Sequence, residues 1–127
     1  MIPQNDLKRQ YALHAAEYEE KALAVLRSGW YVHGREVRAF ESEWADYIGV
    51  KHCVGVGNGL DALWIGIRML GIGPGDEVIV CANAYIACVM GITMNGAAPV
   101  FVEPDRYDNL DAEAVEAAIT YKTRAIL

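Results

Sequence analysis

Apolar residues near the start of the chain recur every three or four positions, the spacing of one face of an amphipathic helix. The first run predicts one helix that ends at Gly29, and the second predicts a helix that ends at Gly49, since glycine suits the left-handed C-cap. A short aromatic loop, Trp30–Gly34, separates them. The first run consists of Leu7, Tyr11, His14, Tyr18, Ala22, Val25 and Leu26, and the second of Val37, Phe40, Trp44, Tyr47 and Ile48.

After Gly49 the apolar runs become short and are bounded by glycine or turn residues, which is typical of buried parallel strands. These runs alternate with helical spacing. The sequence predicts strands at 53–56, 78–80, 99–102 and 124–127, and helices at 60–70, 84–94 and from Asp111, which is a suitable N-cap.

This alternation predicts an α/β fold with three layers, αβα, and a mostly parallel sheet joined by right-handed crossovers. We expect two segments, N-terminal helices with a loop at 1–49 and the first βα units of a larger domain at 50–127. The strand that begins at Arg124 has no successor in the sequence, so we also expect a truncated chain.

Composition narrows the classes of protein. The chain is 54% hydrophobic and 22% charged, with a net charge of −6; this excludes a disordered chain and disfavours nucleic acid as a partner. No stretch predicts a membrane span, and the start lacks the pattern of a signal peptide, so the prediction is cytoplasmic. Three cysteines without a C-x-x-C pair and three scattered histidines predict neither a disulfide framework nor a metal site.

The clearest local signal is the glycine turn at Gly57-Asn58-Gly59, between a predicted strand and a predicted helix. Such a junction presents free amides to an anion, which predicts a phosphate cradle made by the N–H groups of Gly59, Leu60 and Asp61. An ordinary tight turn is the alternative. The turn also fits the dinucleotide fingerprint G-x-G-x-x-A, but no acidic residue follows the next strand, so a Rossmann domain is disfavoured.

Several blocks, taken in order and spacing, carry a family resemblance. They are 28–34, 37–49, 57–63, 70–80, 84–87 and 96–102. With them the chain resembles the N-terminal part of the DegT/DnrJ-type sugar-nucleotide aminotransferases, which are pyridoxal-phosphate enzymes of the aspartate-aminotransferase fold (fold type I).

The resemblance implies roles for four residues at a cofactor site. Gly59, Leu60 and Asp61 would hold the cofactor phosphate through their backbone amides, although Leu60 stands where many relatives have threonine and offers no hydroxyl. Tyr85 would lie against the pyridine ring. From the residues alone, a core aromatic on a helix is the favoured interpretation of Tyr85.

The same resemblance places Tyr31 in a loop that approaches the sugar-nucleotide substrate, with Trp30 and His33 as weaker candidates. A surface aromatic in a glycine-flanked turn is the alternative for Tyr31.

The resemblance also places the Schiff-base lysine and the carboxylate for the pyridine nitrogen beyond position 127. The chain's own lysines are expected on the surface, so no catalytic residue is predicted and the 127-residue chain alone should be inactive. These lysines are Lys8, Lys21, Lys51 and Lys122.

The implied function is transfer of an amino group, with glutamate as the expected donor, to a nucleotide-linked keto-deoxysugar by a cytoplasmic homodimer. Tyr85-Ile86-Ala87 and Val102-Glu103-Pro104 resemble relatives that act on 3-keto-6-deoxyhexoses. The nucleotide and the position of the ketone stay open. The alternative is a non-catalytic fragment that oligomerises or binds phosphate weakly.

Overall fold

The computed structural model describes residues 4–127. The chain divides into two compact units, Met1–Gly55 and Val56–Leu127, and each is described by itself.

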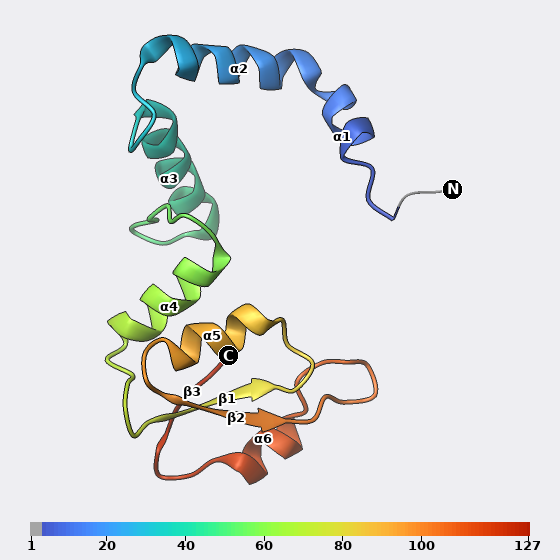
Figure 1. The fold of residues 1–127 in the computed structure, drawn as a ribbon, viewed down its shortest axis with the longest axis vertical. Coiled ribbons are helices and arrows are strands. Elements are labelled where there is room, and N and C mark those ends of the chain that lie inside the picture. The colour runs from blue at the N-terminus through green and yellow to red at the C-terminus, as the bar shows by residue number, and fades with distance from the viewer. Residues whose placement is uncertain (1–3) are drawn as a thin grey trace. The chain divides into compact units, whose positions relative to one another are not determined.

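Over residues 4–55, unit 1 contains three helices, α1 (Leu7–Leu13), α2 (Ala15–Ser28) and α3 (Arg35–Ile48) (Figure 1). Gly29 and Gly49 end α2 and α3 in the left-handed conformation, with φ of 66° and 78°, which confirms both predicted C-caps.

The single helix predicted for the first apolar run is wrong, because His14 interrupts it. His14 has φ −134° and ψ 25°, so it ends α1 and forms the N-cap of α2. Neither helix contains a buried residue, so no packing of an apolar face favours one continuous helix across this point.

Unit 2 contains the sheet, whose three strands are parallel in the order β2-β1-β3. Val78 of the central strand pairs with Pro99 on one side and with Ala125 on the other. The elements follow in chain order as α4 (Gly59–Met69), β1 (Glu77–Cys81), α5 (Ile86–Thr93), β2 (Ala98–Val102), α6 (Ala112–Ala118) and β3 (Thr123–Ile126).

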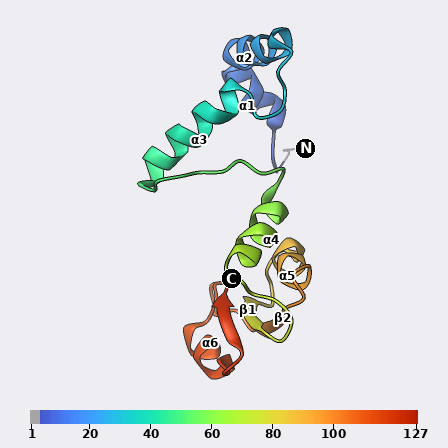
Figure 2. The ribbon, with the colours of Figure 1, turned by 90° about the vertical axis from the view of Figure 1, so that its left-hand side faces the viewer.

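Helices cover both faces of this sheet, which confirms the predicted three-layer α/β architecture. Figures 1 and 2 show α4 and α5 on one face and α6 on the other. Alternate residues of β1 pack into the two layers because side chains alternate along a strand. Val78 and Val80 join Ile67, Ile72, Ile92 and Ala97 in one core cluster, and Ile79 joins Val102 and Val115 in the other.

The strand predicted at 53–56 is wrong. These residues form no helix or strand, and the Val54 side chain is 75% exposed. Glycine alternates with valine here and offers no side chain for cross-strand packing. The Gly55 N–H instead donates to the Glu41 carboxylate on α3 at 2.7 Å.

Two other helix starts can be compared with the sequence predictions. The Asp111 carboxylate accepts the N–H groups of Glu113 and Ala114, which confirms it as the N-cap of α6. The helix predicted from Ala84 begins at Ile86, because Tyr85 has an extended backbone with φ −60° and ψ 141°.

Within residues 4–127, no helix has the length and apolar character needed to cross a membrane.

Candidate functional site

The N-terminus of α4 presents two free amides. The Asn58 side chain caps this helix, since its Oδ1 accepts the Asp61 N–H at 2.9 Å. The N–H groups of Gly59 and Leu60 make no hydrogen bond among the described residues. Of the three predicted amide donors, Asp61 is therefore already engaged, and the other two point from the positive end of a helix dipole.

The turn before α4 is shaped by two polar side chains and a glycine. The Asn58 amide donates to the Asp61 carboxylate at 3.3 Å. A Cβ at Gly57 would lie 2.7 Å from an Asp61 carboxylate oxygen, whereas a Cβ at Gly59 would meet nothing within 4 Å. A side chain at Gly57 would thus displace the Asp61 carboxylate, whereas open space lies beside Gly59.

A cavity of about 610 Å³ connects this helix terminus with Tyr85. It is a site of the size that small ligands and cofactors occupy. The Tyr85 side chain is 77% exposed, so the interpretation of Tyr85 as a core aromatic is wrong. The lining residues are Asn58, Gly59, Leu60, Leu63, Tyr85, Ile86, Ala87, Cys88 and Met90.

Sequence reasoning missed several of these residues. Asn58 is recognisable as an N-cap because asparagine is favoured there, and it precedes Asp61 by three residues. Leu63 and Met90 carry no such signal, since apolar residues at helical spacing are more often core than ligand-binding. The four lysines are all exposed, as expected, and none lines this cavity.

The second candidate region is the aromatic loop of unit 1, beside a cavity of about 340 Å³. Tyr31 lines it, is 62% exposed, and donates its hydroxyl to the Leu26 carbonyl at 3.1 Å. Trp30 lines it too and lies under the Arg38 guanidinium, 5.1 Å from the ring centroid. His33 holds the turn with a positive φ of 50° and does not line the cavity.

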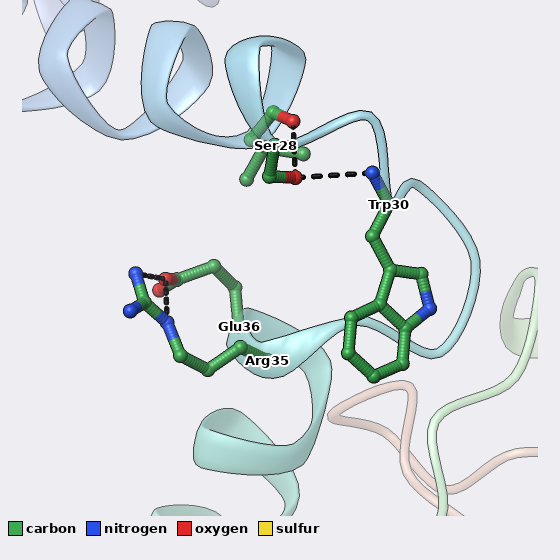
Figure 3. Close-up of polar contacts among 5 residues, drawn as sticks. Ser28, Trp30, Arg35 and Glu36 are labelled. Atoms are coloured by element: carbon green, nitrogen blue, oxygen red, sulfur yellow. Dashed lines mark hydrogen bonds and ion pairs between the residues drawn. The ribbon is translucent and has the colours of Figure 1, made fainter.

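Figure 3 shows polar contacts of Ser28 at the entry of this loop and an ion pair at the start of α3, which follows it. Ser28 donates its hydroxyl to the Val25 carbonyl at 2.7 Å and accepts the Trp30 N–H at 3.1 Å. Arg35 and Glu36 form an ion pair at 3.1 Å at the start of α3. The Ser28 contacts therefore tie the loop that carries Trp30 and Tyr31 to the end of α2, whereas the ion pair joins two neighbouring exposed residues of α3.

The chain is similar to known sugar aminotransferases over its whole length. It is 48% identical to a dTDP-3-amino-3,6-dideoxy-alpha-D-galactopyranose transaminase from Aneurinibacillus thermoaerophilus, over 100% of this chain and 35% of that protein. It matches the crystal structure of Streptomyces venezuelae DesV in complex with a ketimine intermediate, with a TM-score of 0.93 and 47% identity over 98% of this chain and 34% of that one. It also matches Bacillus subtilis NtdA with bound cofactor PMP, with a TM-score of 0.79 and 30% identity over 89% and 26% of the two chains.

The fold is that of an α/β protein with a parallel sheet between two layers of helices. Its candidate site is a cavity that joins the N-terminus of α4 to the exposed Tyr85. The chain belongs to the DegT/DnrJ/EryC1/StrS aminotransferase family, whose sequence profile matches residues 13–127. It spans about a third of the length of the relatives it matches.

Proposed function

We propose that the whole protein is a pyridoxal-phosphate-dependent aminotransferase that transfers an amino group from an amino acid, glutamate being the expected donor, to a nucleotide-linked keto-deoxysugar. Its place would be amino-sugar biosynthesis in the cytoplasm, as a homodimer. Family membership supports the class of reaction. The observation that supports pyridoxal phosphate as the cofactor is the cavity that joins two free amides to an exposed tyrosine ring.

The residues present suit pyridoxal phosphate. The phosphate would accept the N–H groups of Gly59 and Leu60 at the positive end of the α4 dipole. Asn58 holds the Asp61 N–H and donates to the Asp61 carboxylate, so it orders the turn beneath those two donors. Leu60 contributes no hydroxyl, so contact here is limited to the backbone.

When bound, the cofactor supplies an electron sink and carries the amino group between the two substrates. The contribution of Tyr85 is orientation, because a flat aromatic side chain with an exposed face can stack on a planar ring. Tyr31 and Trp30, on the aromatic loop of unit 1, are the proposed contacts to the nucleotide-linked sugar.

The cradle can be tested by removing one donor without disturbing the helix. Gly59 is the first residue of α4, a position where proline is tolerated, and Asn58 already has the extended backbone that precedes proline. Gly59→Pro in the whole protein removes one N–H to a charged group, worth about 1.5–3 kcal/mol. We therefore expect pyridoxal phosphate and inorganic phosphate to bind about 10- to 150-fold more weakly.

Gly59→Ala is the matched control, because a Cβ there meets nothing within 4 Å and the N–H is kept. Affinities are measured by equilibrium dialysis, and amino transfer from glutamate to a dTDP-linked 3-keto-6-deoxyhexose is followed in parallel. Equal affinities for the proline and alanine variants would contradict the proposed cradle. Absence of transfer by the wild-type protein to any nucleotide-linked keto-sugar would contradict the proposed reaction.

A further inference from the structure

The two sides of the candidate cofactor cavity belong to different helices. Leu60 and Leu63 come from α4, whereas Cys88 and Met90 come from α5, and Tyr85 is the N-cap of α5. The distance between the amides and the tyrosine ring therefore depends on how closely the two helices pack. Both views show these helices side by side (Figures 1 and 2).

Gly91 sets the closest approach of the two helices. A Cβ at this position would lie 2.9 Å from the Leu63 Cβ and 3.4 Å from the Trp64 nitrogen, and both of these atoms belong to α4. A separation of 2.9 Å between two carbon atoms is shorter than van der Waals contact, so any side chain at Gly91 would push the helices apart. Leu63 is also a lining residue of the cavity, so the displacement would reach the site directly.

Asn95 joins the same helices by hydrogen bonds. Its Nδ2 donates to the Trp64 carbonyl of α4 and to the Gly91 carbonyl of α5, both at 2.9 Å. The residue is 5% exposed, and its Oδ1 has no hydrogen-bond partner among the described residues. Burying an amide oxygen without a partner costs free energy, so this oxygen does not explain why asparagine stands here. What an apolar residue of similar size could not provide is the two donated hydrogen bonds.

From this geometry we infer that Gly91 and Asn95 are positioning residues that set the distance between Tyr85 and the phosphate-binding amides. The inference rests on the proposed function, because it concerns the same cavity. Gly91 fixes how near α5 can come, and Asn95 holds it there. Neither residue lines the cavity, so both would act through the placement of the tyrosine ring.

The test is a double-mutant cycle in the whole protein, with the dissociation constant of pyridoxal phosphate as the readout. We expect Gly91→Ala to weaken binding of pyridoxal phosphate by about 3- to 10-fold. This loss of affinity should not exceed the loss caused by removing the Tyr85 ring itself. In the Tyr85→Ala background the same change should weaken binding by less than about twofold, because the ring it displaces is already gone. Gly66→Ala on α4 is the matched control, since its Cβ meets nothing within 4 Å, and it should leave the affinity unchanged.

Asn95→Leu keeps the side-chain size and removes both donated bonds, so it serves as the second variant if Gly91→Ala does not fold. Thermal unfolding of each variant and its binding of inorganic phosphate, which needs only the α4 amides, are measured beside the affinity for pyridoxal phosphate. We expect phosphate binding to be retained while pyridoxal phosphate binding falls. Losses that add fully to that of Tyr85→Ala, or wild-type affinity in both variants, would overturn the positioning role. If the wild-type protein binds neither ligand, the proposed cofactor site itself is wrong, and the positioning role is wrong with it.

Discussion

Replacement of Tyr85 by alanine separates a ligand-binding role from a structural one. The Tyr85 side chain is 77% exposed, and its backbone accepts the Cys88 N–H at 2.9 Å, a bond that alanine retains. Removing the ring should therefore change the free energy of unfolding by no more than about 0.5 kcal/mol, as at other exposed positions.

The expected loss of cofactor affinity is larger than this change in stability. An aromatic stacking contact contributes about 0.5–1.5 kcal/mol beyond the burial of area. That range corresponds to a dissociation constant for pyridoxal phosphate about 2- to 13-fold higher in Tyr85→Ala. Tyr85→Phe keeps the ring and should stay close to the wild type.

The assay is a fluorescence or absorbance titration of the whole protein with pyridoxal phosphate, together with urea unfolding of the same samples. Tyr121→Ala is the matched control, because Tyr121 is 86% exposed and does not line the cavity. Unchanged affinity in Tyr85→Ala would refute the stacking role. A loss of stability well above 0.5 kcal/mol would refute the claim that the ring contributes little to the fold.

Three further predictions concern the framework of the site, each measured by equilibrium urea unfolding of the whole protein. Ile92 is 0% exposed, so Ile92→Ala should cost about 2–5 kcal/mol and Ile92→Val about 0.5–1.5 kcal/mol; equal effects of the two would contradict the packing described. Asn58→Ala should cost about 0.5–2 kcal/mol through loss of the N-cap bond to Asp61, whereas Asn109→Ala, whose side chain makes no hydrogen bond among residues 4–127, should cost much less. The Gly73 N–H and the Arg124 guanidinium, each 3.0 Å away, hold the pKa of Asp76 below its ordinary value. Its folded pKa is depressed, so this contribution to stability is present above the unfolded carboxyl pKa of about 3.9 and is lost as the pH falls through the folded value. The stability difference between wild type and Asp76→Asn should thus be constant from pH 7 to pH 5 and shrink on further acidification; a difference that grows below pH 4 would reverse the assignment.

The sheet and its covering helices could be predicted because their signals are local. Apolar runs bounded by glycine mark β1 and β2, and an aspartate before α6 marks its N-cap. The break at His14 could not be predicted in this way, because the apolar spacing continues through it from Tyr11 to Tyr18. Periodicity reports which positions share a face and does not report whether anything packs on that face.

The candidate site was predictable in its turn chemistry and in two of the three amide donors that the sequence suggested. Glycine and asparagine before an apolar helix predict free amides, and the structure leaves those of Gly59 and Leu60 free. That Asn58 already engages the Asp61 amide depends on a side-chain conformation, which the sequence does not specify. The exposure of Tyr85 depends on where α5 begins, and helix boundaries are the least certain part of a prediction from sequence.

Trp64, whose backbone carbonyl accepts the Asn95 amide, can serve as an internal optical probe in this 127-residue chain. The chain has three tryptophans, and Trp64 is the one that lies in the unit with the sheet. The residue is half-buried on α4, and it is joined to α5 through the same Asn95 side chain, which also donates to the Gly91 carbonyl. In the 127-residue chain with Trp30 and Trp44 replaced by phenylalanine, the emission wavelength of the remaining indole would report the surroundings of α4, the helix that Asn95 joins to α5, without any added label.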